Sequence, residues 1–243
     1  MSRALPLEEI PVFDQQHRLP EELTPQEPAV ILFDKPAGWS SFKAVKAIRK
    51  RLNIKKVGHA GTLDPLATGL LVICVNKATK SISQVQELHK TYRALIRFGA
   101  STSSYDAATE IDMEAPFNHI DRNLIEAELA QSFNEEFEQI PPMFSAIKKN
   151  GQRLYKLARK GETVERKARK VTIFKTVIHS YDPPDLDLDI ECSKGTYIRS
   201  IAHDLGINLG SRAYLAGLHR TKIGTFDVRN ALQADDLQVA KSS

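Results

Sequence analysis

The acidic residue Asp64 is a candidate catalytic residue because of the sequence that surrounds it. It follows the small and polar run GHAGTL and is the only acidic residue between Asp34 and Glu87, an interval rich in lysine and arginine. The apolar run LLVICV at residues 70–75 then predicts a buried strand that anchors a tight loop around this acid. Such a carboxylate can act as a nucleophile or a general base. The alternative is that Asp64 and Pro65 only form a turn.

The string around this acid matches a known pattern almost without exception. GHAGTLDPLATGLL, followed by ATK, resembles the catalytic motif GHxGTLDPxATGLL…ATK of the TruB family of tRNA pseudouridine synthases. The resemblance implies that Asp64 is the catalytic aspartate and that His59 fills the space left by a flipped-out base. The string DKPAGWSS resembles the family's first motif, which implies that Lys35 and Pro36 support the catalytic loop.

The segment KTYRALIRF at residues 90–98 alternates between apolar and polar residues. This pattern predicts a strand with Tyr92 on its apolar face, where an aromatic residue is usually part of the core. The segment also resembles the family motif KTYxAxxxFG. That resemblance implies instead that Tyr92 stacks on the target base.

The string KGTYIRSIAHDLG predicts a helix that begins after Thr196 and ends at Gly206. Arg199 then lies in the first turn, where a cation opposes the helix dipole and needs a carboxylate partner. The string resembles the family motif KGTYIRxLAxDLG. The resemblance implies that Arg199 pairs with Asp64 and that Tyr197 flanks the site.

Three further interpretations concern residues near these motifs. The string LAGLHRTKIGTF predicts the last pair of strands and resembles LxRxxxGxF, which implies that Leu218 lines the uridine pocket. Residues 100–114 predict a loop, where TSSYDAAT replaces the family's TDTxDxxG-like stretch and only Asp106 is given a role. His203 and Asp204 are interpreted as surface or capping residues.

Positive charge is concentrated in residues 147–170, which hold ten lysines and arginines against two glutamates. This net charge of +8 predicts the RNA-binding face, with a solvated helix face as the alternative. The candidate RNA contacts are Lys148, Lys149, Arg153, Lys156, Arg159, Lys160 and Arg166.

A second basic surface is expected on a helix over residues 42–52. Its apolar face carries Phe42, Val45, Ile48 and Leu52. The opposite face is either solvated or in contact with phosphates. Its cations are Lys43, Lys46, Arg49, Lys50 and Arg51.

Other periodic segments alternate between strand and helix. Strands are expected over 29–33, 170–178 and 186–191, and helices over 78–88 and 121–132. The resemblance covers about residues 30–227 in five blocks. It implies an α+β pseudouridine synthase fold: a central, mostly antiparallel mixed sheet with flanking helices and an RNA-gripping insertion.

The composition sets further limits. The 243 residues are 42% apolar and 26% charged, with a net charge of +4, and such usage is typical of a globular protein. Residues 1–28 carry a net charge of −4 and predict an acidic, flexible arm, so residues 29–243 form the catalytic domain and carry +8. We expect a catalytic domain alone, without the C-terminal PUA domain that many members of the resembled family carry. No membrane span, secretory signal or cysteine-based metal site is present, which favours a cytoplasmic protein with two reduced core cysteines.

The implied activity is the isomerisation of uridine to pseudouridine at position 55 in the TΨC loop of tRNA. It requires no cofactor and no metal, and the expected protein is a monomer that binds the T arm without a guide RNA. Two alternatives are a catalytic subunit of a guide-RNA-dependent synthase and a non-enzymatic RNA folding factor that uses only its basic face.

Overall fold

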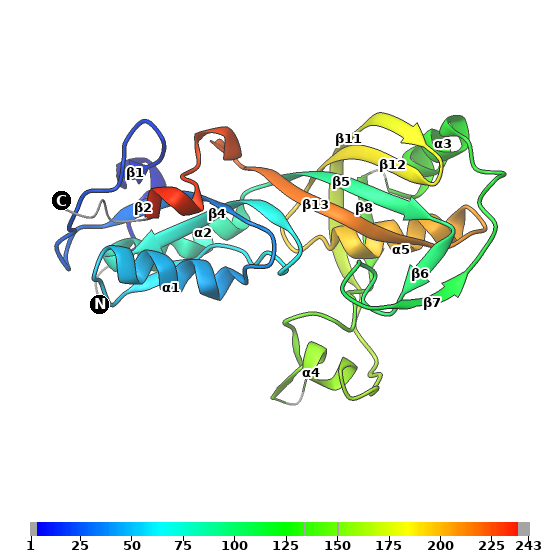
Figure 1. The fold of residues 1–243 in the computed structure, drawn as a ribbon, viewed down its shortest axis with the longest axis horizontal. Helices are drawn as coiled ribbons and strands as arrows, with labels where there is room; N and C mark the ends of the chain where they lie inside the picture. The colour runs from blue at the N-terminus through cyan, green and yellow to red at the C-terminus, as the bar shows by residue number, and fades with distance from the viewer. Residues whose placement is uncertain (1–3, 134, 150, 238–243) are drawn as a thin grey trace. The chain divides into compact units, whose positions relative to one another are not determined.

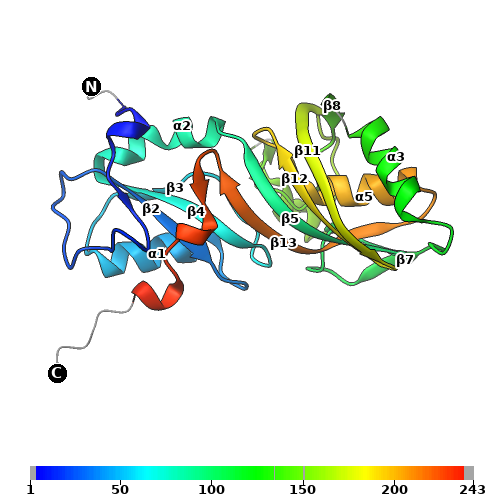
Figure 2. The ribbon, with the colours of Figure 1, turned by 90° about the horizontal axis from the view of Figure 1, so that it is seen from above.

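The computed structural model describes residues 4–133, 135–149 and 151–237. The chain divides into two compact units, Met1–Tyr92 with His219–Ser243 and Arg93–Leu218. The chain passes from one unit to the other in strands β5 (Lys90–Phe98) and β13 (Ala213–Ile223), which are drawn in Figures 1 and 2. We describe each unit by itself.

The first unit is built on two buried strands. β2 (Ala29–Lys35) and β4 (Thr68–Val75) pair antiparallel along their whole lengths. The short strand β3 (Val57–His59) also pairs antiparallel with β4, while β1 (Val12–Phe13) runs parallel to β2. Because both faces of β2 and β4 are covered, these strands read as continuous apolar runs, as the sequence predicts for 29–33 and 70–75.

The described part of the acidic arm packs against this unit. Ile10 is 3% exposed in one core cluster, and Phe13, Leu19 and Leu23 pack against another. The 3₁₀ turn η1 (Leu7–Glu9) precedes this contact. The boundary expected at residue 28 is therefore not a boundary between the compact units.

Helix α1 (Ser41–Arg51) confirms the helix expected from residue 42, and the Ser40 side chain caps it. The prediction for Phe42 is wrong, because its side chain is 63% exposed. At 100° per residue, position 42 lies about 90° from the middle of the stripe formed by Val45, Ile48 and Leu52. The helix expected over 78–88 is a 3₁₀ segment, η2 (Asn76–Ser81), followed by α2 (Ile82–Glu87).

The second unit has the strand order β13-β5-β12-β11-β8. β11 (Arg169–Asp182) pairs antiparallel with both β12 (Asp185–Cys192) and β8 (Glu135–Gln139). Helices α3 (Arg122–Ser132) and α5 (Ile198–Asn208) lie side by side in this unit (Figure 2).

The loop expected over 100–114 is instead a small hairpin of β6 (Ala100–Thr102) and β7 (Ile111–Glu114). The pattern of the sequence misses it because β6 has three small residues and all four residues of β7 are exposed.

A short module is inserted before β11. It contains β9 (Lys148–Lys149), β10 (Gln152–Arg153) and α4 (Leu154–Ala158), and has a small core of Met143, Leu154 and Leu157. After β13 come β14 (Phe226–Asp227), η3 (Val228–Asn230) and η4 (Ala234–Leu237). The predicted α+β class with a mixed, mostly antiparallel sheet is confirmed. No helix in the described part of the chain is long and apolar enough to cross a membrane.

Candidate active site

Asp64 lies in the loop between β3 and β4, in the first unit. The hydroxyl of Ser41, at the start of α1, accepts from the Leu63 N–H at 2.9 Å and donates to the Leu63 carbonyl at 3.1 Å. The Gly38 N–H donates to the Pro65 carbonyl at 2.8 Å. Backbone bonds therefore fix the loop on both sides of Asp64, and its side chain is half-buried. A carboxylate held this way needs little reorganisation before it reacts.

Lys35 is fully buried beneath this loop. Its ammonium group donates to the carbonyls of Trp39 at 2.7 Å, Pro36 at 3.1 Å and Pro65 at 3.4 Å. Burial lowers the pKa of Lys35 to about 8, although the nearby Asp64 carboxylate partly opposes this shift. Lys35 thus ties the turn after β2 to the loop that carries Asp64.

Arg220 from β13 is a buried cation that the sequence analysis missed. Its side chain is 1% exposed, and its Nε donates to the Leu70 carbonyl at 2.7 Å. Its terminal nitrogens donate to the carbonyls of Gly61 at 3.2 Å and Thr62 at 3.5 Å. Arg220 therefore holds the beginning of the Asp64 loop and the strand that follows it. The available signal was the arginine of the LxR pattern, from which only Leu218 was taken.

His59 stands at the end of β3, half-buried beside this loop. Burial lowers its pKa, and the positive charge of Arg220 lowers it further, so the ring is neutral at pH 7. Its Nδ1 is buried and has no hydrogen-bond partner among the described residues. The role predicted for His59 in filling the space of a flipped base stays a prediction.

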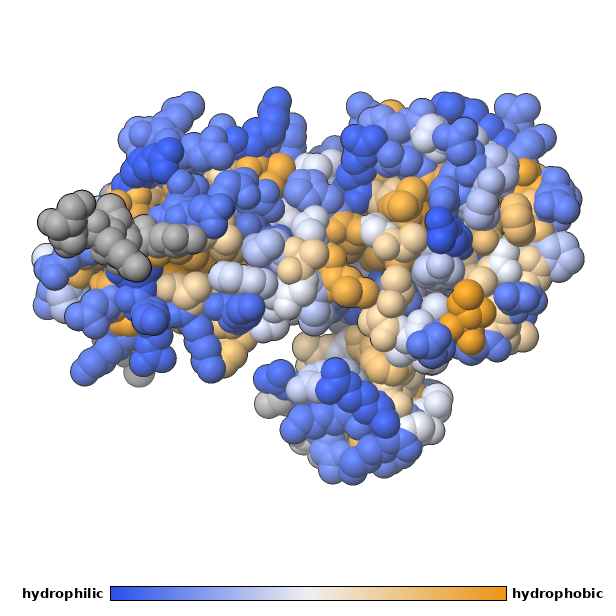
Figure 3. All heavy atoms as spheres, viewed as in Figure 1, coloured by the Kyte–Doolittle hydropathy of each residue, from blue (hydrophilic) through white to orange (hydrophobic). Residues whose placement is uncertain are grey.

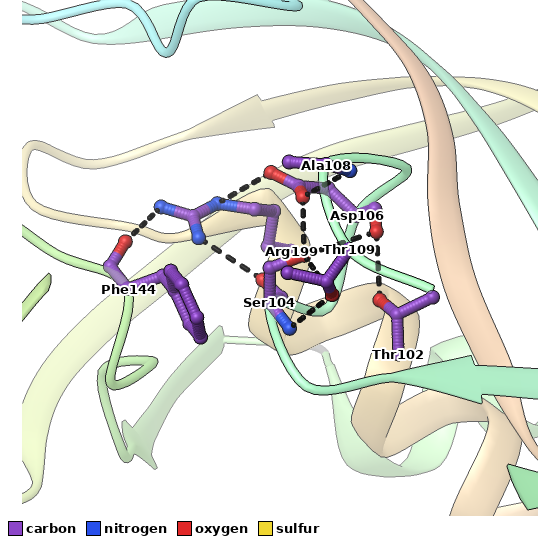
Figure 4. Close-up of polar contacts among 7 residues, drawn as sticks. All are labelled: Thr102, Ser104, Asp106, Ala108, Thr109, Phe144 and Arg199. Atoms are coloured by element: carbon purple, nitrogen blue, oxygen red, sulfur yellow. Dashed lines mark hydrogen bonds and ion pairs between the residues drawn. The ribbon is translucent and has the colours of Figure 1, made fainter. Parts of the chain in front are cut away.

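Arg199 forms the second polar cluster, in the second unit (Figure 4). It is only 4% exposed and projects from the first turn of α5. Its terminal nitrogens donate to the carbonyls of Ser104 at 3.0 Å and Phe144 at 2.9 Å. Its Nε lies 3.6 Å from a carboxylate oxygen of Asp106.

Asp106 organises the loop on the other side of this ion pair. Its second carboxylate oxygen accepts from the Ser104 hydroxyl at 2.6 Å and the Ala108 N–H at 3.0 Å. The Thr109 hydroxyl in turn lies 2.9 Å from that of Ser104. Arg199 therefore has the carboxylate partner that its place in the helix demands. The pairing of Arg199 with Asp64 would join the two units and stays a prediction.

Tyr197 immediately precedes α5, which begins one residue later than the sequence predicts. Its N–H donates to the Gln139 side chain at 2.8 Å, and its carbonyl accepts from the same side chain at 3.1 Å. Gln139, 1% exposed, thus positions Tyr197 and is a second residue that the sequence analysis missed. The Arg169 guanidinium lies 5.6 Å from the centre of the Tyr197 ring.

Two other predicted site residues, Tyr92 and Leu218, lie within β5 and β13, where the chain passes from one unit to the other. Tyr92 on β5 is 9% exposed, and Leu218 on β13 is half-buried. The stacking role of Tyr92 and the pocket role of Leu218 stay predictions.

The interpretation of His203 and Asp204 as surface residues is wrong. Both are half-buried, and the His203 ring stacks on Tyr105 with 3.7 Å between ring centres. Burial raises the pKa of Asp204 to about 6. Tyr105 lies between β6 and β7, in the hairpin that the sequence predicts to be a loop, and its ring covers His203 of α5.

The basic segment of the inserted module is only partly available to a ligand. Arg153, Lys156, Arg159 and Lys160 are exposed, and hydrophilic side chains cover the module in Figure 3. Arg166 is half-buried and donates to the Pro141 carbonyl at 3.2 Å. The side chains of Lys148 and Lys149 lie outside the described part of the structure.

No cluster of three or more His, Cys, Asp or Glu residues that could hold a metal ion occurs within 4–133, 135–149 and 151–237. Cys74 and Cys192 are both buried.

Comparison with known proteins agrees with this geometry. Residues 49–198 match the model of the TruB family pseudouridylate synthase N-terminal domain. The chain is 49% identical to a tRNA pseudouridine synthase B of Flavobacterium johnsoniae, over 86% of this chain and 96% of that protein. It is 41% identical to one of Syntrophotalea carbinolica, over 86% of this chain and 68% of that protein.

Solved structures give the same fold. A chain of a Cbf5-Nop10-Gar1 complex matches with a TM-score of 0.68 and 28% identity, over 92% of this chain and 56% of that one. A chain of the archaeal box H/ACA sRNP Nop10-Cbf5 complex matches with a TM-score of 0.63 and 26% identity, over 86% of this chain. The present chain covers 52% of that second chain, so it spans about half the length of both.

Proposed function

This chain belongs to the TruB family of pseudouridylate synthases, and we propose that it converts uridine to pseudouridine at position 55 in the TΨC loop of tRNA. In this reaction the C1′–N1 glycosidic bond breaks, the uracil turns, and a C1′–C5 bond forms. Substrate and product are isomers, so the balance of atoms and electrons requires no redox partner and no cofactor.

The observation that carries the proposal is the fixed loop around Asp64. Two bonds of the Ser41 hydroxyl to Leu63 and one from the Gly38 N–H to the Pro65 carbonyl hold the residues beside it, and Lys35 and Arg220 also bond to carbonyls of the loop. Asp64 is assigned as the essential carboxylate, which either attacks C1′ or removes a sugar proton. Tyr92 is assigned to stack on the uracil and Arg199 to orient the acid, while His59 occupies the space of the flipped base.

The proposed partner is the T arm of tRNA alone. The relatives at 41–49% identity are tRNA pseudouridine synthases B, and we infer that this chain likewise acts on free tRNA, as a cytoplasmic monomer. Residues 29–243 form the proposed catalytic domain, preceded by the acidic arm 1–28.

The test uses purified protein and a tRNA transcript that lacks modifications. Wild type should produce one pseudouridine at position 55, mapped by chemical labelling and primer extension. Asp64→Asn should abolish turnover and keep tRNA binding within a few-fold, because it removes the acid and little volume. Asp182→Asn, an exposed aspartate at the end of β11, is the matched control and should turn over normally. Turnover in Asp64→Asn contradicts the assignment.

The similarity to chains of box H/ACA complexes supports one alternative, a synthase that needs a guide RNA. The same assay separates the two functions. Modification of bare tRNA supports the present proposal, whereas modification only after a guide RNA is added supports the alternative. Binding of RNA without any modification supports the folding factor.

A further inference from the structure

Two aromatic rings and two lysines lie at the start of α1: Trp39 just before the helix, and the other three residues in its first two turns. We name Trp39, Phe42, Lys43 and Lys46 the aromatic–lysine patch. Phe42 is 63% exposed, and the Lys46 ammonium lies 4.9 Å from the centre of its ring. The Lys43 ammonium lies 4.4 Å from the Trp39 ring. Long hydrophilic side chains project in Figure 3 from the region where Figure 1 places α1.

The electrostatics of the helix do not account for the two lysines. Lys43 lies in the first turn, where a cation opposes the helix dipole. Lys46 is three residues from Lys43 and four from Lys50, spacings at which like charges repel. Arg49 and Lys50 differ, since cations in the last turn of a helix are stabilising.

The charge of the patch is also not balanced locally. The sequence holds no acidic residue between Asp34 and Asp64. Across the described part of the chain, no carboxylate forms an ion pair with Lys43 or Lys46. The large exposed ring of Phe42 likewise has no role in the core. A ligand that is both anionic and aromatic would satisfy both features at once.

The patch is joined directly to the loop of Asp64. The Ser41 hydroxyl, between Trp39 and Phe42 in the chain, makes both of its hydrogen bonds to Leu63. The Trp39 carbonyl accepts from Lys35, whose ammonium also bonds to the Pro65 carbonyl. A molecule bound on the patch is therefore held by the same framework as the reactive acid.

We propose that the aromatic–lysine patch binds an RNA strand, with an unpaired base stacked on Phe42 and neighbouring phosphates on Lys43 and Lys46. A flat aromatic ring offers stacking to any base, and lysines match the charge of the backbone. The inference rests on the proposed function only for the identity of the RNA, which is the tRNA itself. An acidic peptide would need the lysines and not the exposed ring, so the ring distinguishes the two ligands.

The first test varies the ring and measures tRNA affinity by filter binding. Phe42→Leu keeps an apolar side chain and removes the stacking face, so it should weaken binding by about 5- to 100-fold. Phe42→Tyr keeps the face and should bind within about twofold of wild type. Because Phe42 is exposed, neither change opens a cavity. Leu124→Ala on α3, where the side chain is 41% exposed, is the control and should have no effect.

The second test varies the charge. Lys43→Gln with Lys46→Gln should reduce the slope of log affinity against log salt by about 1.4 to 1.8, the value for two lost phosphate contacts. Lys175→Gln, an exposed cation of β11, should leave the slope unchanged. Trp39 is the only tryptophan of the chain, so its fluorescence should also change on titration with tRNA and saturate at the same affinity.

These measurements do not depend on turnover. If wild type leaves tRNA unmodified and Phe42→Leu still weakens RNA binding, the proposed function fails and the patch stands. If wild type modifies tRNA and Phe42→Leu binds like wild type, the patch fails and the function stands. A salt slope that is unchanged in the double lysine variant would also overturn the inference. So would Trp39 fluorescence that does not change on titration with tRNA, or an equal loss of affinity in Phe42→Tyr and Phe42→Leu.

Discussion

Lys35 is a buried cation whose charge state should be visible in the pH dependence of activity. Its pKa is lowered to about 8 by burial, so above that pH it becomes neutral beside Asp64. The neutral amine has two hydrogens for the three carbonyls that now accept from it. We expect kcat/KM to fall with an apparent pKa of about 8. The measurement is a pH–rate profile of wild type against Lys35→Met. The variant should be less active, and its kcat/KM should not fall with an apparent pKa of about 8.

The same shift predicts a dependence of stability on pH. Between about pH 8 and 10.5 the unfolded chain holds the Lys35 proton and the native protein does not. The free energy of unfolding of wild type, relative to Lys35→Met, should therefore rise with pH by at most about 1.4 kcal/mol per unit. Urea denaturation at several pH values checks this, and a difference that falls with pH would contradict it.

Removing one partner of the Arg199–Asp106 ion pair should cost far more stability than removing one partner of a surface pair. Both side chains are nearly buried, so Asp106→Asn leaves a guanidinium with less compensation, at a cost of about 3–5 kcal/mol. The control is Asp185→Asn, which breaks the half-exposed pair with Arg97 and should cost about 1 kcal/mol or less. Urea denaturation measures both, and equal losses would show that Asp106 does not compensate the buried charge of Arg199.

Whether a site residue can be predicted depends on where its contacts come from. The loop of Asp64 is bonded to Lys35 and Ser41, which lie 30 and 22 residues before their partners in the loop. Both segments carry a motif that is evident in the sequence. Arg220 instead holds a carbonyl 150 residues away, and Gln139 bonds to the backbone of Tyr197, 58 residues away. Such contacts exist only after the strands have paired, and no local pattern predicts them.

At the scale of elements, α5 depends on one glycine for its close approach to β13. A Cβ at Gly206 would overlap the backbone nitrogen of Ala213 and come within 2.6 Å of the Arg212 carbonyl carbon. The sequence predicts that the helix ends at Gly206, but α5 continues to Asn208. The glycine is needed for packing rather than for termination.

Gly206→Ala should therefore destabilise the protein, although alanine is favoured over glycine by about 1 kcal/mol in an exposed helix. We expect a loss of about 1–3 kcal/mol, because the obstructing atoms are backbone. Thermal unfolding measures it. Ile207→Ala, at an exposed position of the same turn, is the control and should cost less. An unchanged or raised Tm in Gly206→Ala would show that β13 moves away freely.

The elements that were predicted well are those with a long and regular pattern. β5 occupies Lys90–Phe98 as predicted, since its buried and exposed residues alternate without a break. The hairpin β6–β7 was missed because its strands are short and small or exposed. Phe42 fits the helical spacing of the apolar residues of α1 but lies at the edge of the buried face and is exposed. Spacing alone does not distinguish such an edge position from a buried one.

At the scale of the whole molecule, charge is divided between two basic surfaces and an acidic arm. The arm carries −4 and residues 29–243 carry +8. The arm was predicted to be flexible because its sequence is polar and aperiodic, yet its few apolar residues pack on the core. Burial of scattered side chains depends on the surface they meet, which the sequence of the arm does not contain.

The basic module should dominate the salt dependence of RNA binding. Of the five candidate contacts whose side chains the structure describes, four are exposed (Arg153, Lys156, Arg159 and Lys160), whereas Arg166 is bonded to Pro141. Substituting these four by glutamine should reduce the slope of log affinity against log salt by about 2.8 to 3.6.

The control for this change removes cations that are already neutralised. Arg93 and Arg97 are bonded to Asp187 and Asp185, so Arg93→Gln with Arg97→Gln should leave the slope nearly unchanged. Slopes measured by filter binding from about 50 to 200 mM salt decide the matter. If the fourfold variant keeps the slope of wild type, these cations are a solvated surface, and the salt dependence arises elsewhere on the molecule, with α1 as the first region to examine.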